Sequence, residues 1–433
     1  MWSRIGAPIS MAGMLLRPSL DLALLVSAGA AFATPPVQLV ETRPVESGLG
    51  NPALPAPQAV WLEMIGGAKR TLDIEQFYLS TWPGEPMDKV VDAIGAAAKR
   101  GVRVRLILDQ RMHGTYPQPA DSLRSVPGIE VRLVNLGPIA GGIQHAKFFI
   151  VDGEEVFLGS QNFDWRALEH IHELGVRVRD ARVAQTIGEA FEWDWRAAGD
   201  QMAGRDSTGA QARASARPAG PRAHAVSIVQ APGDTVDVRP SYTPKAFIPD
   251  STLWDRDAIV RLLDAARREV VVQLLTYSIG GHSQRDSTLD AALRRAAGRG
   301  VSVRLVVSDW EPDNPRIADL QSLAGTPNVE ARLSTVPEWS GGYIPFARVE
   351  HCKYMVVDSL WTWVGTSNWE PGYFHGTRNV AVSLRNRPIA LEARKIFDAS
   401  WRAPGNRVVK PGETYERKAH GATPPAGKTA YGK

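Results

Sequence analysis

The sequence contains few of the features that mark a specialised class of protein. Its 433 residues include one cysteine, Cys352, so an internal disulfide framework is excluded and stability must come from packing. The formal net charge is only +4, which is too small to indicate a nucleic-acid-binding protein by itself. With 44% hydrophobic and 22% charged residues, the chain has the composition of a folded protein long enough for two fused halves.

Long apolar runs are also scarce. The run "LALLVSAGAAFA" (residues 22–33) follows Arg4 and Arg17 and ends in a small-residue A-x-A pattern. It is shorter than the roughly 20 residues that a membrane-spanning helix needs. A basic start, a short apolar region and this ending are typical of a cleavable export signal. We therefore predict a signal peptide over residues 1–33, a Pro-rich leader over residues 34–54, and an exported protein, periplasmic or secreted, that is not a multi-span membrane protein.

The rest of the chain is an internal duplication. "QHAKFFIVDGEEVFLGSQN" from Gln144 and "EHCKYMVVDSLWTWVGTSN" from Glu350 both read His-x-Lys, four residues, Asp, six residues, Gly-Ser/Thr-x-Asn. The same offset of 206 aligns "AFEWDWRAAG" (190–199) with "IFDASWRAPG" (396–405). Upstream, "AAKRGVRVRLIL" matches "AAGRGVSVRLVV" at an offset of 199. We predict a first half over residues 55–199, a flexible linker over 200–225, a second half over 226–405 and a disordered tail over 406–433.

Within each half, strand and helix patterns alternate. In the first half, residues 71–79, 102–109, 129–135 and 173–180 read as strands, and residues 87–101 and 181–197 read as helices. Residues 146–153 and 155–162 read as a hairpin that turns at Asp152-Gly153. This alternation predicts an α/β fold in which a mixed sheet is flanked by helices.

The repeated motifs carry the chemistry. On a strand, His145 and Lys147 share one face, as do His351 and Lys353, whereas Cys352 points away, which argues against a catalytic cysteine. An imidazole, an ammonium and an amide suit phosphoryl transfer: one histidine attacks phosphorus, and the other protonates the leaving oxygen and then activates water. The lysines, with Asn162 and Asn368, would hold the anionic transition state without a metal. We predict that the two halves supply one shared site.

These residues resemble the HKD motifs of the phospholipase D superfamily, and the resemblance extends from about residue 55 to residue 405. It implies a pseudo-twofold duplicated phospholipase D fold with one active site, a phosphohistidine intermediate and no cofactor. "LGSQNFDWRALEHIHELGV", "YIPFARVEHCKYMVVD" and "GTSNWEPGYF" are similar to the branch with animal phospholipase D types three and four, which implies 5′ exonuclease activity on single-stranded DNA and RNA.

The resemblance also implies a role for each motif residue. His145 is the expected nucleophile and His351 the acid/base, or the reverse. Glu173 would orient the opposite histidine, and its counterpart in the second half is Asn379, so the pair is asymmetric. The remaining expected roles are phosphate binding by Lys147, Lys353, Asn162 and Asn368 with Ser160 and Thr366 in support, and a structural role for Asp152 and Asp358.

Several alternatives stay open at this point. "EHIHE" (169–173) resembles a metal-ligand cluster, but a surface location is favoured, and no metal site is predicted. Tyr343, Trp369 and Phe374 are candidates for stacking nucleic-acid bases or lining an acyl groove. The substrate is a phosphodiester, with single-stranded nucleic acid favoured over phospholipid, and monomer and homodimer both remain open. A non-catalytic binding protein on the same fold is disfavoured because both sets of histidines and lysines are intact.

Overall fold

The computed structural model describes residues 34–205, 225–280, 284–310, 312, 315–416, 418 and 420–431. The predicted signal peptide (1–33) and most of the predicted linker (206–224) lie outside the described residues. In the ranges that the structure describes, no helix combines the length and the apolar character needed to cross a bilayer.

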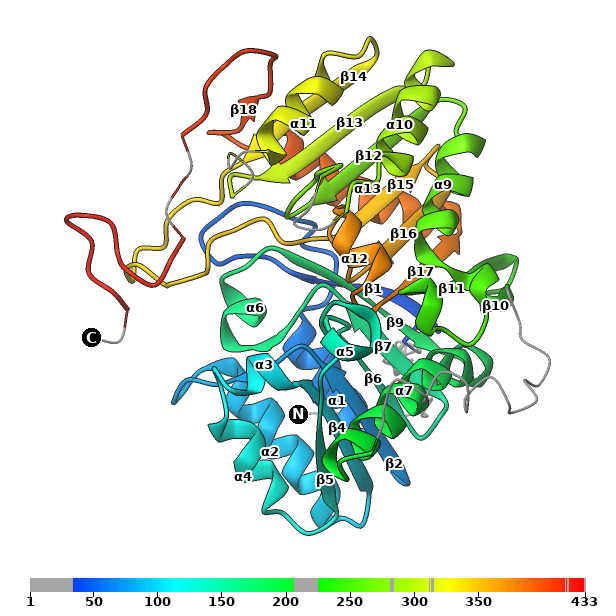
Figure 1. Cartoon of the computed structure of the whole chain (residues 1–433), viewed down its shortest axis with the longest axis vertical. Helices are drawn as coiled ribbons and strands as arrows, with labels where there is room; N and C mark the ends of the chain where they lie inside the picture. The colour runs from blue at the N-terminus through cyan, green and yellow to red at the C-terminus, as the bar shows by residue number, and fades with distance from the viewer. Residues whose placement is uncertain are drawn as a thin grey trace, which may run out of the picture. The chain divides into compact units, whose positions relative to one another are not determined.

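The first half is built on a seven-stranded mixed sheet with the strand order β1-β9-β7-β6-β2-β4-β5 (Figure 1). Strands β2, β4 and β5 are parallel, and β6, β7 and β9 run antiparallel to their neighbours. The strand bounds are β1 Val37–Thr42, β2 Thr71–Gln76, β4 Arg103–Asp109, β5 Ile129–Val134, β6 Phe148–Val151, β7 Glu155–Gly159 and β9 Glu173–Arg179. Two short strands, β3 (Leu79–Ser80) and β8 (Phe163–Asp164), pair separately.

Helices cover both faces of this sheet. Phe148 and Ile150 of β6 belong to one hydrophobic cluster with α7 (Ala181–Met202), whereas Phe149 and Val151 belong to another with α1 (Pro57–Gly67) and α2 (Pro86–Lys99). This alternation follows from the period of two along a strand. The shorter helices are α3 Gln110–His113, α4 Gln118–Arg124, α5 Gly137–Ala140 and α6 Trp165–Glu169.

The second half repeats the arrangement in a nine-stranded sheet with the order β10-β11-β17-β16-β15-β12-β13-β14-β18. Its strands are β10 Val226–Ala231, β11 Asp234–Thr243, β12 Glu269–Leu274, β13 Ser302–Ser308, β14 Val329–Ser334, β15 Tyr354–Val357, β16 Trp361–Gly365, β17 Asn379–Arg385 and β18 Arg407–Val408. Its helices are α9 Asp255–Ala265, α10 Thr288–Gly298, α11 Arg316–Ala324, α12 Pro371–His375 and α13 Arg387–Arg402. Figure 1 shows α9, α10 and α11 in front of this sheet and α13 behind it.

The two sheets share the inner order β9-β7-β6-β2-β4-β5 and β17-β16-β15-β12-β13-β14. The predicted duplicated α/β fold, with mixed sheets flanked by helices, is therefore confirmed. Local capping repeats as well: the Asp180 side chain accepts from Arg182 N at the start of α7, and the Asn386 side chain accepts from Ile389 N at the start of α13.

The motif aspartates brace the hairpins. Asp152 and Asp358 adopt left-handed backbone angles (φ 55° for each) at the turn between two strands. The Asp152 carboxylate accepts from the backbone N–H groups of residues 69–71, and the Asp358 carboxylate accepts from those of residues 267–269. Both side chains tie a helix–strand junction to the hairpin, as a structural role requires.

The Pro-rich leader and the tail that was predicted to be disordered both contain residues paired with the sheets. In the expected leader, Val37–Thr42 form β1, which pairs antiparallel with β9. In the expected disordered tail, Arg407 and Val408 pair with β14, and His420 is buried with its Nε2 2.8 Å from Asp309 Oδ1. Composition predicted disorder for the tail, but Arg407, Val408 and His420 contact distant parts of the chain.

Candidate active site

The two motif histidines meet where the halves join, and the backbone of each is held by the opposite half. His145 N donates to Arg378 O (3.0 Å), and His351 N donates to His172 O (2.9 Å). These bonds belong to two parallel bridges, Gln144 with Arg378 and His172 with Glu350. Each histidine lies just before a central strand, β6 or β15, and is buried. One site therefore takes its two histidines from the two halves, as predicted.

Each imidazole is oriented by a side chain of the other half. His351 Nδ1 lies 2.7 Å from Glu173 Oε2, the partner that the sequence predicted. His145 Nδ1 lies 3.0 Å from Asn379 Oδ1. Asn379 Nδ2 donates to Thr243 Oγ1 (3.1 Å), which turns Oδ1 toward the ring and makes Nδ1 of His145 the donor. In this tautomer, Nε2 of His145 keeps its lone pair.

The motif lysines lie beneath the histidines. Lys147 Nζ donates to His145 O (2.6 Å), Lys353 Nζ donates to His351 O (2.8 Å), and both side chains are fully buried. Burial lowers the pKa of Lys147 well below its ordinary value and that of Lys353 to about 8. Such buried cations favour an anion at the site, because an opposite charge restores the charged form of the lysine.

The same surroundings act on the histidines and on Glu173. Burial, followed by the charges of the two lysines, lowers the pKa of both His145 and His351 well below the ordinary value. Burial raises the pKa of Glu173, and the lysines oppose that rise. Both imidazoles are therefore held in the neutral form until an anion enters, and a neutral imidazole is the form that can attack phosphorus.

The Gly-Ser/Thr-x-Asn segments divide into two roles. The amide oxygens of Asn162 and Asn368 are buried and accept no hydrogen bond from any residue that the structure describes, so each can accept one from a donor group of a ligand. A phosphate oxygen is itself an acceptor and would have to be bound by the amide Nδ2–H groups. The hydroxyls are occupied: Ser160 Oγ donates to Leu174 O (3.2 Å), and Thr366 Oγ1 donates to Asn379 Oδ1 (2.9 Å). Ser160 and Thr366 thus support β9 and the His145 partner, and their support of phosphate binding stays a prediction.

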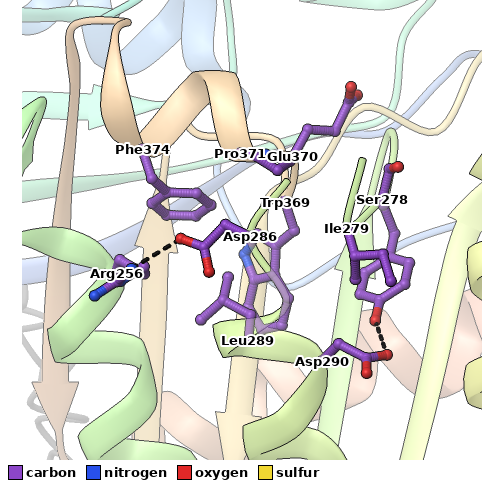
Figure 2. Close-up of a pocket in the computed structure, with 11 residues that line it drawn as sticks. Arg256, Ser278, Ile279, Asp286, Leu289, Asp290, Trp369, Glu370, Pro371 and Phe374 are labelled. Atoms are coloured by element: carbon purple, nitrogen blue, oxygen red, sulfur yellow. Dashed lines mark hydrogen bonds and ion pairs between the residues drawn. The ribbon is translucent and has the colours of Figure 1, made fainter. Parts of the chain in front are cut away.

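Two of the three predicted stacking residues are buried in the core. Trp369 and Phe374 are buried core residues, with Trp369 packed edge-on against Trp363. Figure 2 shows both on the wall of a small pocket beside the Arg256–Asp286 ion pair. Tyr343 instead donates through its hydroxyl to Gly421 O (2.6 Å) in the tail. Trp369 and Phe374 therefore serve packing, whereas a stacking role for Tyr343 stays a prediction.

The aromatic rings that do flank the site are Phe77 and Tyr373. Their centroids lie 4.9 Å and 5.0 Å from the His145 ring, and Lys147 Nζ lies 5.1 Å from the Phe77 centroid. Phe77 directly follows β2, and Tyr373 lies on α12, so neither belongs to the repeated motif. Tyr373 follows Asn368 by five residues, so proximity to a motif could have indicated it, whereas Phe77 precedes His145 by 68 residues and has no such signal.

The "EHIHE" segment is buried, contrary to the surface location favoured from the sequence. His170 and His172 are 2% and 0% exposed. Among the described residues, His172 with Glu350 and Cys352, and His170 with Glu85 and Glu169, are close enough to share a cation. Both His172 ring nitrogens are already hydrogen-bonded to carboxylates, so the His172 cluster has the geometry of an ion-pair network. Burial raises the pKa of the Cys352 thiol well above its ordinary value, which makes it a poor nucleophile.

Duplicated α/β halves that share two histidines and two lysines define a class of phosphoryl-transfer enzyme. A family model described as "Cardiolipin synthase, PLD-like domain" matches residues 61–195 and again 259–401, and the chain belongs to this phospholipase D-like family. Phospholipase D Z of Dictyostelium discoideum is 29% identical over 386 residues, covering 85% of this chain and 89% of that protein. The 5′-3′ exonuclease PLD3 of Homo sapiens is 29% identical over 408 residues, covering 85% and 80%.

Solved structures agree on the fold. The crystal structure of phosphatidylserine synthase from Haemophilus influenzae superposes with a TM-score of 0.61 at 13% identity, covering 82% of this chain and 85% of that one. The chain is thus a phosphodiester hydrolase of the phospholipase D superfamily.

Proposed function

We propose that this chain is a metal-independent phosphodiesterase that shortens single-stranded DNA or RNA from the 5′ end through a phosphohistidine. The observation that carries the proposal is the unequal pair of dyads, His145 with the neutral amide of Asn379 and His351 with the carboxylate of Glu173. A carboxylate stabilises an imidazolium, whereas an amide leaves the ring neutral. The first histidine is therefore the nucleophile and the second is the acid/base.

The reaction then follows from the geometry. Nε2 of His145 attacks phosphorus while His351, which is protonated once the anionic substrate is bound, gives its Nε2 proton to the leaving oxygen, so that a P–N bond forms and a P–O bond breaks. Water, deprotonated by His351, then cleaves the P–N bond and returns both rings to their starting state. Lys147 and Lys353 supply positive charge to the non-bridging oxygens, and the amide Nδ2–H groups of Asn162 and Asn368 donate hydrogen bonds to them.

Two observations support nucleic acid as the substrate. Relatives in several mammals are named 5′-3′ exonucleases, including PLD4 of Mus musculus at 29% identity over 403 residues. Phe77 and Tyr373 beside His145 provide ring surfaces on which a base can stack. The second candidate is a phospholipase D that acts on phospholipid headgroups, which the name of the Dictyostelium relative favours.

One paired assay separates the two candidates. Purified protein without added metal receives either an end-labelled single-stranded oligonucleotide with a free 5′ hydroxyl or phosphatidylcholine micelles, with His145→Ala as the blank. We expect stepwise shortening from the 5′ end that His145→Ala and His351→Ala abolish. Choline release with an intact oligonucleotide would establish the lipase instead. Wild-type activity in both alanine variants would contradict the two-histidine mechanism.

We further propose that the protein is exported, on the basis of the signal-like residues 1–33. N-terminal sequencing of protein recovered from the producing cell's exterior or periplasm should give a chain that starts after Ala33. A chain that retains Met1 or Met14 would refute cleavage.

A further inference from the structure

A buried ion-pair network lies directly behind the Glu173–His351 dyad. We call it the buried triad: Glu41, His172 and Glu350. His172 Nε2 lies 2.9 Å from Glu41 Oε1, and its Nδ1 lies 2.7 Å from Glu350 Oε2. All three side chains are 0% exposed. None of them belongs to the repeated motif pattern, and the reaction described above does not use them.

The triad is joined to the dyad through the backbone. His172 immediately precedes Glu173, and Glu350 immediately precedes His351. The two pairs lie side by side in a parallel bridge, in which His172 N donates to Val349 O (3.1 Å) and His351 N donates to His172 O (2.9 Å). Because neighbouring side chains on an extended backbone point to opposite sides, the triad occupies the side opposite the dyad. Glu41 adds a third segment, β1, which pairs with β9.

The triad is fully satisfied as an ionic network. The two carboxylates outweigh the cost of burial and hold the pKa of His172 at about 10, so the ring is an imidazolium at neutral pH. The outer carboxylate oxygens are used as well: Asn51 N donates to Glu41 Oε2 (2.7 Å), and Cys352 N donates to Glu350 Oε1 (3.1 Å). Because all of its hydrogen bonds are made inside the protein, the His172 imidazolium is held rigidly in one position.

The other dyad has a matching cation. Arg378, which is 206 residues after His172, immediately precedes Asn379 and forms the corresponding bridge with Gln144. Its guanidinium is fully buried and pairs with Asp194, with Nε 2.6 Å from Oδ2 and Nη2 3.0 Å from Oδ1. In both halves, a buried cation therefore stands one residue before the side chain that orients the opposite histidine.

From this repeated placement we propose that His172 is a positioning residue, which acts through the backbone bridge to hold Glu173 and His351 in register across the two halves. The proposal rests on the proposed function and extends it. Loss of the imidazolium loosens the bridge and lets the Glu173 carboxylate and the His351 ring separate. The steps that need His351, protonation of the leaving oxygen and activation of water, then slow down. Attack by His145 on a substrate with a good leaving group is spared.

The test variant is His172→Gln, which keeps a hydrogen-bonding side chain but removes the charge. If His172→Gln folds poorly, Glu41→Gln is the second variant. It removes one carboxylate and leaves the His172–Glu350 pair intact. The control is Asp73→Asn, which breaks the largely buried Arg105–Asp73 ion pair on β2 and β4 (2.7 Å). The substrates are an unmodified single-stranded oligonucleotide and bis(p-nitrophenyl) phosphate, whose leaving group needs no acid.

With the oligonucleotide, we expect kcat of His172→Gln to fall on the order of 10- to 100-fold, as for misplaced catalytic groups, with KM little changed. With bis(p-nitrophenyl) phosphate, the first-turnover burst should keep its rate while the steady state after it slows, because water activation still needs His351. Asp73→Asn should leave kcat, KM, the burst rate and the steady-state rate at their wild-type values. Equal losses in burst, steady state and oligonucleotide cleavage would mean that His172 matters only for folding, and would overturn the proposal.

A second readout does not depend on turnover. A short Nδ1–H to carboxylate hydrogen bond gives a far-downfield proton resonance, which the His351→Ala variant identifies by its absence. We expect this resonance in wild type and Asp73→Asn and its loss or upfield shift in His172→Gln. If wild type cleaves neither substrate but the resonance changes as stated, the proposed function fails and the positioning role stands. An unchanged resonance in folded His172→Gln would refute the positioning role.

Discussion

The buried imidazolium of His172 makes the free energy of unfolding depend on pH. Its folded pKa, about 10, lies above the ordinary histidine value of about 6.5. The native state therefore keeps a proton that the unfolded chain releases. The sign follows directly: this stabilisation is complete below about pH 6.5 and is lost as the pH rises toward about 10.

The contribution of His172 to the free energy of unfolding changes steeply between pH 7 and pH 8. An unfolded histidine has lost most of its proton there, so native His172 holds nearly one more proton than the unfolded chain, and its contribution falls by about 1.2 kcal/mol over the unit. Burial lowers the pKa of Lys353 to about 8, which gives a change of opposite sign above that pH. His172→Gln retains Lys353, so the difference between wild type and variant cancels the lysine contribution.

The assay is urea unfolding of wild type and His172→Gln at pH 7 and pH 8 and constant ionic strength. The stability difference between the two proteins should shrink by about 1.2 kcal/mol from pH 7 to pH 8. A difference that stays constant over this interval would show that the buried ring is neutral. In that case the triad would be a hydrogen-bonded network with a protonated carboxyl, and its role as a buried cation would be refuted.

Three further substitutions probe other parts of the structure. Arg378→Met should lower the free energy of unfolding by about 3–5 kcal/mol in urea titrations, because Asp194 is left buried without its partner; a loss under 1 kcal/mol would contradict the pairing. Gly50→Ala should also destabilise the protein, since Gly50 has a φ of 87° and a Cβ would overlap the Glu41 carboxylate; an unchanged urea midpoint would argue against that packing. Cys352→Ala should retain turnover, and the wild-type thiol should react with thiol reagents only on unfolding; fast labelling of folded protein would disprove its burial.

The repeated motifs predicted most of the site because their spacing fixes their place on the sheet. The period of two along residues 145–152 places His145 and Lys147 together, and the offset of 206 finds their counterparts His351 and Lys353. The Glu173–His351 contact followed from the family resemblance and is present in the structure at 2.7 Å.

What the sequence could not predict depends on contacts between distant residues. "EHIHE" reads as a polar surface segment, yet His172 is buried between Glu41 and Glu350. These partners lie 131 residues before it and 178 residues after it, so no local pattern could predict the contact. Strand β1 and the tail residues Arg407 and Val408 likewise depend on pairing with β9 and β14, which no local sequence pattern predicts. Trp369 and Phe374 follow a motif closely but point into the core.

The two backbone bridges bear on the ancestry of the chain. Each half supplies the histidine of one dyad and the orienting residue of the other, so a solitary ancestral half would have completed its site only by pairing with an identical copy. In such a homodimer, every substitution enters both dyads at once. A single polypeptide that carries both halves lacks that coupling. Glu173 and Asn379, and behind them His172 and Arg378, can therefore differ in this chain, so that its two histidines have unequal partners.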